Sequence, residues 1–188
     1  MSNSKFIVIA APSGSGKTTL VNKLLMEKNL NLSFSVSATS RAPRNNEVDG
    51  LNYLFLTKDE FLKRVKNKEF IEWEEVYENT YYGTLISELE NAFQKNLIFD
   101  IDVNGGLKIK KKFPKQTITI FIKPPSIIEL EARLINRNLD SNSSIKTRIN
   151  KAKNEMLLAD KFDHIVENNI LEISYSKVLE LVKSFING

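Results

Sequence analysis

Apolar residues occur along the chain in two patterns that alternate with each other. Short continuous runs predict strands, and the first and third of them have the pattern of strands buried on both faces of a parallel sheet. These runs are Lys5–Ala10, Leu32–Ser37, Leu97–Asp102, Thr117–Ile122 and His164–Glu167. Between them, apolar residues recur at helical spacing from Lys17, from Gly105 to Lys112, from Ser126 to about Arg137 and from about Ser144 to Lys161. Val178 to Phe185 marks a last helix, so the order predicts an α/β fold with a parallel sheet flanked by helices.

The segment from about residue 38 to residue 84 interrupts this alternation. Strand-like pieces occur at Tyr53–Leu56, Phe70–Tyr77 and Tyr81–Tyr82, and Thr57 with Glu60 forms a capping box before a short helix. We expect an antiparallel insert carried on the α/β core, with a return to helix over Thr84–Gln94.

Composition limits the chemistry that is open to the protein. The chain has 188 residues, of which 41% are hydrophobic and 27% are charged, as in one ordinary globular domain. It has no cysteine and one histidine, His164, which excludes disulfides, thiolate sites and multi-histidine metal sites. The net charge of +4 is compatible with anionic ligands. The first apolar run is too short for a signal peptide or a membrane span, so we expect a cytoplasmic protein without a membrane partner.

The strongest chemical signal is a phosphate-binding loop between the first strand and the first helix. Its glycines let backbone N–H groups turn inward, and the helix N-terminus adds positive potential. Lys17 is expected to bridge the outer phosphates of ATP, and the Thr18 hydroxyl to bind Mg²⁺. Ala11 replaces the glycine that usually opens this motif. The expected ATP-binding residues here are Ser13, Gly14, Ser15, Gly16, Lys17, Thr18 and Thr19.

Two acids end the third predicted core strand. Because ligands bind at the carboxyl ends of such strands, Asp102 is predicted to hold Mg²⁺ through water. The alternative is that one of the two acids, Asp100 or Asp102, caps the following helix.

The insert carries side chains suited to a nucleoside monophosphate. Arg41 and Arg44 are three residues apart, and both guanidinium groups can donate bidentate hydrogen bonds to one phosphate. Tyrosine hydroxyls can donate to the same phosphate. Glu72 can accept two N–H bonds from a base edge. Guanine offers adjacent N–H and NH₂ donors, whereas adenine does not.

At this point the sequence resembles the guanylate kinase family over nearly its whole length. The resemblance rests on ordered matches at Pro12–Thr19, Phe34–Ser37, Thr39–Arg44, Glu47, Gly50, Tyr53, Phe70–Trp73, Tyr81–Thr84, Asp100–Val103, Gly105, Arg133, Arg137, Asp140–Ser141, Arg148, Ala152 and Glu155. It implies a P-loop NTPase-type α/β fold in one domain. The core would be residues 1–37, 85–125 and 162–188, the GMP-binding insert about 38–84, and a helical lid about 126–161.

The resemblance also implies residue roles and a reaction. GMP would be held by Ser37, Arg41, Arg44, Tyr53, Glu72, Tyr82, Thr84 and Asp100. Arg133, Arg137 and Arg148 would close on ATP, with Asn168 near the adenine. The implied reaction is ATP + GMP = ADP + GDP with Mg²⁺, dGMP being an expected second acceptor. Lys17, Arg44, Arg137 and Arg148 would be catalytic by neutralising the transferring group.

Three other readings stay open from the residues alone. The chain could be a non-catalytic guanylate-kinase-like binding module, or a kinase for another small phosphate acceptor. The lysines from Lys108 to Lys115 could bind nucleic acid, although a basic run of this kind is usually a solvated face, so no specific nucleic-acid partner is expected. The sequence does not report an oligomeric state.

Overall fold

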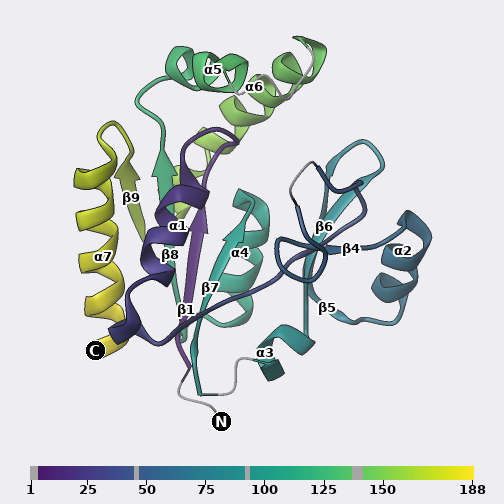
Figure 1. The fold of residues 1–188 in the computed structure, drawn as a ribbon, viewed down its shortest axis with the longest axis horizontal. Coiled ribbons are helices and arrows are strands. Elements are labelled where there is room, and N and C mark those ends of the chain that lie inside the picture. Colours follow the sequence, from purple (N-terminus) through teal and green to yellow (C-terminus); the bar gives the residue numbers. More distant parts are fainter. Residues whose placement is uncertain (1–3, 45–46, 92–93, 137–141) are drawn as a thin grey trace.

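A five-stranded parallel sheet forms the core of the computed structural model, which describes residues 4–44, 47–91, 94–136 and 142–188 (Figure 1). The strand order is β2-β7-β1-β8-β9, and every neighbouring pair is parallel. The strands are β1 (Phe6–Ala10), β2 (Leu32–Phe34), β7 (Asn96–Ile101), β8 (Thr117–Lys123) and β9 (His164–Glu167). The predicted α/β class is therefore confirmed.

Helices cover both faces of this sheet because its central strand is apolar at every position. Ile7 and Ile9 of β1 belong to a cluster with α1 (Lys17–Leu25) and α7 (Leu171–Asn187). Phe6 and Val8 point the other way, into a cluster with Ile109 of α4 (Val103–Lys112). Figure 1 shows α7 and α1 on one side and α4 on the other. Successive side chains of a strand alternate between faces, so an unbroken apolar run needs cover on both.

A second sheet, of order β4-β3-β6-β5, carries the insert beside the core. Its elements are β3 (Ala38–Thr39), β4 (Leu54–Phe55), α2 (Lys58–Lys66), β5 (Phe70–Tyr77) and β6 (Thr80–Leu85). The β5–β6 and β3–β6 pairs are antiparallel, as expected, but β3 and β4 run parallel. Phe61 of α2 is fully buried and stacks on Phe70 and Tyr81, so the insert has an aromatic core of its own.

Helices α5 (Ile127–Asn136) and α6 (Asn142–Met156) pack on each other above the carboxyl ends of the core strands (Figure 1). Their shared core is apolar: Leu130, Leu134, Ile145, Ile149 and Ala152. Two short 3₁₀ turns, η1 (Lys28–Leu30) and η2 (Ala159–Lys161), and a short helix, α3 (Ser87–Asn91), complete the elements.

Several predicted boundaries are wrong, each for a local reason. Thr84 and Leu85 lie in β6 rather than in a helix, because Thr84 pairs with Glu72 across the hairpin. Asp102 is the N-cap of α4 and not a strand residue. The helix expected to reach Lys161 ends at Met156, and β2 ends at Phe34. The predicted capping box at Thr57 and Glu60 is present in full.

No helix in the described part of the chain is both long and apolar enough to cross a membrane.

Candidate active site

The loop after β1 has the backbone shape that phosphate binding needs. Gly14 and Gly16 adopt positive φ angles of 96° and 87°, and Gly16 is the N-cap of α1. A Cβ atom at Gly16 would lie 2.5 Å from the Asn168 amide nitrogen. Both the positive φ and this close approach therefore require glycine at the position. The buried Asn168 side chain donates to the Ser15 carbonyl at 2.7 Å and holds the loop from behind.

The first two side chains of α1 reach the end of β7. Lys17 Nζ donates to the Ile101 carbonyl at 2.9 Å and forms an ion pair with Asp100. The Thr18 hydroxyl donates to the other oxygen of Asp100 at 3.0 Å. Asp100 is therefore the carboxylate that faces the residues expected to meet ATP and its metal ion.

Asp102 is the residue predicted to hold the metal ion, and its two carboxylate oxygens have different surroundings. Oδ1 accepts from the Gly105 backbone at 2.7 Å and caps α4, which is the alternative role that the sequence left open. Oδ2 is buried with no hydrogen bond within the described residues and lies 3.6 Å from Lys151 Nζ.

A divalent ion would find few protein ligands here. Across the described ranges, no three histidine, aspartate or glutamate side chains form a group that could hold a metal ion. Mg²⁺ keeps several waters and binds nucleotide phosphates through one or two protein oxygens, so Thr18 and a nearby aspartate fit such a site.

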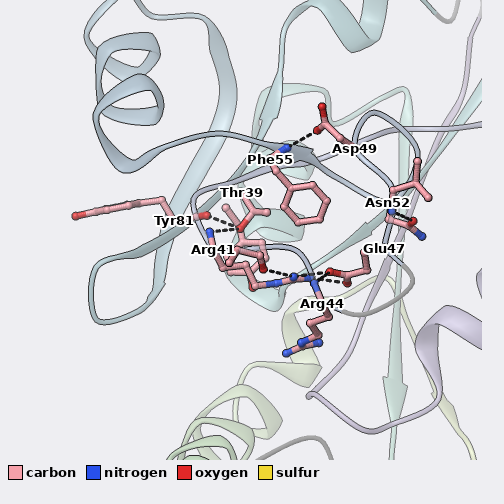
Figure 2. Close-up of polar contacts among 11 residues, drawn as sticks. Thr39, Arg41, Arg44, Glu47, Asp49, Asn52, Phe55 and Tyr81 are labelled. Atoms are coloured by element: carbon pink, nitrogen blue, oxygen red, sulfur yellow. Dashed lines mark hydrogen bonds and ion pairs between the residues drawn. The ribbon is translucent and has the colours of Figure 1, made fainter.

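Arg41 is fixed by a network within the insert (Figure 2). Its terminal nitrogens donate to Glu47 at 2.6 and 2.7 Å, and its Nε donates to the Tyr82 hydroxyl oxygen at 3.0 Å. The hydrogen bonds from Arg41 hold the pKa of the Glu47 carboxyl below its usual value. Because the Tyr82 oxygen already accepts from Arg41, its own proton remains to be donated to a ligand.

Tyr53 and Arg44 complete the basic wall of the insert. Tyr53 lies edge-on to Tyr82, with the Arg41 guanidinium 4.9 Å from its ring centre. Burial raises the pKa of the Tyr53 hydroxyl to about 12, so it remains a donor at neutral pH. The Arg44 backbone N–H donates to the Glu47 carboxylate. The Arg44 guanidinium extends away from the ion pair of Arg41 and Glu47 (Figure 2).

Glu72 lies buried on β5, with Thr84 of β6 and Gly105 of α4 next to its carboxylate. Its Oε1 accepts from the Thr84 hydroxyl at 2.8 Å, and its Oε2 would be 2.8 Å from a Cβ at Gly105, so the missing side chain there makes room for the carboxylate. Burial raises the pKa of Glu72 to about 7, although the Thr84 hydrogen bond acts in the opposite direction. Because each carboxylate oxygen has two lone pairs, Glu72 can accept a pair of N–H donors while its Oε1 also accepts from Thr84.

The arginines expected in the lid occupy different places. Arg148 on α6 donates to the Ser13 hydroxyl of the phosphate loop at 3.0 Å. Arg133 pairs with Glu129 at 3.0 Å and approaches the Asn168 carbonyl at 3.5 Å. Arg137 lies outside the described residues.

One cleft of about 240 Å³ joins these groups. The phosphate loop forms one wall, and Ser37, Arg41, Arg44, Tyr53, Glu72, Tyr82, Asp100, Asp102 and Arg148 line the rest. Thr84, Arg133 and Asn168 do not line the cleft. Thr84 and Asn168 contact Glu72 and Ser15, which do line it, whereas Arg133 contacts Asn168.

Sequence reasoning assigned no role to several residues that line the cleft, among them Tyr77, Lys151 and Glu155. Lys151 and Glu155 follow Arg148 at helical spacing, so the pattern 148, 151 and 155 could have placed them on one face of α6. Tyr77 carries no comparable signal, because it reads as one more aromatic residue of a strand.

The cleft is suited to phosphoryl transfer by alignment and charge neutralisation. Lysine and arginine side chains enter it from the phosphate loop, the insert and α6, and His164 does not line it. Such a site can bring two polyanions together without a general base.

Comparisons with known proteins agree with this geometry. The family description that matches residues 3–185 is "Guanylate kinase". A guanylate kinase of Bacteroides thetaiotaomicron is 49% identical over 185 residues, covering 97% of this chain and 90% of the relative. One of Porphyromonas gingivalis is 47% identical, covering 97% of this chain and 98% of the relative.

A solved structure extends the match to the fold. The crystal structure of guanylate kinase from Anaplasma phagocytophilum superposes with a TM-score of 0.79 at 29% identity, covering 97% of this chain and 86% of that one. On the matched family description and these relatives, the chain belongs to the guanylate kinase family.

Proposed function

We propose that this protein transfers the γ-phosphoryl group of ATP to GMP, giving ADP and GDP. One observation carries the proposal beyond family membership. A single cleft places a phosphate loop opposite an arginine–tyrosine wall and a buried carboxylate. The first is suited to ATP, and the other two are suited to the phosphate and the base of GMP.

We assign the walls of the cleft as follows. Ser13 to Thr19 would hold the phosphates of ATP, with Arg133, Arg137 and Arg148 closing from the lid segment, about residues 126–161. Arg41, Arg44, Tyr53 and Tyr82 would hold the phosphate of GMP in the insert, about residues 38–84. Glu72, oriented by Thr84, would read guanine together with Ser37, and Asp100 would lie close by.

Enzymes that transfer a phosphoryl group from ATP generally bind it with a divalent metal ion on its phosphates. For this chain we propose Mg²⁺, held chiefly by the phosphates of ATP and water, with the Thr18 hydroxyl as a protein ligand. Asp100, which contacts Thr18, is better placed than Asp102 to support that ligand. Bound Mg²⁺ would neutralise charge on the transferring phosphates.

The chain's own residues would supply alignment rather than acid–base chemistry. The attacking group is a phosphate oxygen of GMP, whose second pKa is about 6, so it is largely ionised at neutral pH. Lys17, Arg44, Arg137 and Arg148 would then offset the repulsion between the two nucleotides. Closure around the pair excludes water, which would otherwise accept the phosphoryl group.

The decisive experiment measures ADP formation with ATP, Mg²⁺ and each of GMP, dGMP, AMP, UMP, CMP and dTMP. We expect strong turnover with GMP and dGMP alone. Turnover with a different acceptor would reject the assignment of Glu72 while keeping the phosphate loop. Binding of GMP without any turnover would instead support a non-catalytic module.

Glu47→Gln tests whether the Arg41 network organises the GMP phosphate site. The variant loses the charge that fixes the guanidinium and, through it, the Tyr82 hydroxyl. We expect KM for GMP to rise about tenfold, with kcat changed less than about threefold. Asp49→Asn is the control, because the Asp49 carboxylate accepts from the backbone N–H of Phe55 in β4. A lower KM in Glu47→Gln would mean that Glu47 competes with the phosphate for Arg41.

Asn168→Ala separates two roles of Asn168. If its amide only supports the loop at Ser15, KM for ATP rises about tenfold and the ratio of ATP to GTP use stays unchanged. If it reads adenine, that ratio falls as well. Steady-state kinetics with both phosphoryl donors distinguish the two results.

A further inference from the structure

Tyr77 joins the insert to helix α6 across the cleft. It is the last residue of β5, and its ring lies under two cations of α6. Lys151 Nζ is 5.3 Å from the ring centre, and the Arg148 guanidinium carbon is 6.0 Å away. Cations at such distances from an aromatic face are attracted to it.

The same two cations also contact groups of the core. Arg148 donates to the Ser13 hydroxyl of the phosphate loop at 3.0 Å. Lys151 Nζ lies 3.6 Å from Asp102 Oδ2 of the core, and 3.5 Å from Glu155 Oε1 within α6. A continuous path of contacts therefore runs from the phosphate loop through Arg148 to Tyr77 and the hairpin of the insert.

The surroundings of Tyr77 favour a role between the two nucleotide sites. The side chain is partly buried and lines the cleft, and burial raises the pKa of its hydroxyl, which therefore stays neutral. The charged groups that act on the pKa of this hydroxyl include Arg148 and Glu155 of α6 and Arg44 of the insert. The Tyr77 ring thus contacts Arg148, which is expected at the phosphates of ATP, and its hydroxyl feels the charge of Arg44, which is expected at the phosphate of GMP.

We propose that Tyr77 is a positioning residue that couples the two substrate sites, so that occupation of the ATP site strengthens GMP binding. This inference rests on the proposed function. ATP phosphates would hold Arg148 at the loop that it already contacts, and the contact of Arg148 with the Tyr77 ring would hold the β5–β6 hairpin in place for GMP. Because binding couplings are reciprocal, GMP strengthens ATP binding by the same factor.

The test is calorimetric titration of GMP with and without a saturating non-hydrolysable ATP analogue and Mg²⁺. For the unaltered protein we expect the analogue to tighten GMP binding by about tenfold. In Tyr77→Leu this factor should fall to less than about twofold, while the Kd for GMP alone changes little. Tyr77→Phe should keep the factor, because the ring face and not the hydroxyl carries the contact.

Two further variants sharpen the result. Lys151→Met keeps the apolar stem of the side chain and should lose part of the coupling, with no further loss when it is added to Tyr77→Leu. Tyr175→Leu is the matched control, because Tyr175 also lies beneath a cation, Lys23 at 4.9 Å, but belongs to α7. Its coupling factor should equal that of the unaltered protein.

Four outcomes would overturn the proposal. They are an unaltered protein that binds GMP without coupling, a Tyr77→Leu variant that keeps the coupling, a Tyr77→Phe variant that loses as much as Tyr77→Leu, and a Tyr175→Leu variant that loses it equally. The third would assign the coupling to the Tyr77 hydroxyl and not to the ring face. Failure of the unaltered protein to bind GMP at all would instead reject the proposed function on which this coupling depends.

Discussion

Replacing Lys17 with methionine is expected to lower kcat by at least about 10³-fold while leaving GMP binding within about twofold. The ammonium group of Lys17 lies where α1 meets the end of β7, at the Ile101 carbonyl and the Asp100 carboxylate. It is thus already held at the mouth of the phosphate loop. Methionine keeps the length of the side chain and removes only the charge that would follow the moving phosphoryl group.

Lys23→Met is the control for this prediction. Lys23 lies on the same helix but pairs with Glu172 of α7, away from the cleft, and its loss should leave kcat unchanged. The measurements are kcat from coupled ADP formation, the Kd of GMP from calorimetry, and the thermal midpoint of each variant. A Lys17→Met protein that loses GMP binding and turnover to the same extent would show damage to the fold instead.

The parts of the fold that were predictable are those decided by local pattern. The unbroken apolar run of β1 predicts cover on both faces, and helices are found on both. The capping box at Thr57 and Glu60 starts α2 where expected. These features depend on neighbours in sequence, so periodicity and capping chemistry can locate them.

The parts that were not predictable depend on contacts between distant segments. Thr84 reads as the start of a helix, but its pairing with Glu72 keeps it in a strand. Asp100 and Asp102 are equivalent in a strand pattern, and only the approach of Thr18 and Gly105 distinguishes them. Glu47 resembles any loop acid until Arg41 is seen to bind it with both terminal nitrogens.

The second large expected effect is on the use of GMP, and it follows from removing the charge of the buried Glu72 carboxylate. We expect Glu72→Gln to lower kcat/KM for GMP by about 10³-fold, because two charge-assisted hydrogen bonds to the base edge are lost. One amide N–H would also face a guanine N–H. The substitution preserves the shape of the side chain and an oxygen for the Thr84 hydroxyl, so that the loss reports on the charge.

The pH dependence of GMP binding gives this prediction a second measurement. The pKa of Glu72 is raised to about 7, chiefly by burial, with the charges of Asp102 and Lys108 acting in opposite directions. Only the ionised form accepts both guanine donors, so the affinity for GMP should rise roughly tenfold between pH 6 and pH 8. Ionisation of the GMP phosphate near pH 6 adds a smaller rise, which Glu72→Gln should retain.

Stability should change in the opposite direction to binding. Because the pKa of Glu72 is about 7 in the folded protein and 4.5 ordinarily, the folded state holds the proton more tightly. Its contribution to stability therefore falls as the pH rises from about 4.5 to 7, by about 3 kcal/mol. Glu72→Gln should accordingly melt about 6 to 12 °C higher than the unaltered protein at pH 8, and at nearly the same temperature at pH 4.5.

Glu75→Gln, an exposed position on the same strand, is the matched control and should change neither GMP binding nor the melting temperature. A Glu72→Gln protein that melts higher at pH 8 and binds GMP poorly would show that the fold tolerates a destabilising charge because the guanine site requires it. A variant that is less stable at pH 8 would mean that Glu72 serves the packing of β5 against α4. Its effect on kcat/KM could then no longer be assigned to recognition of the base.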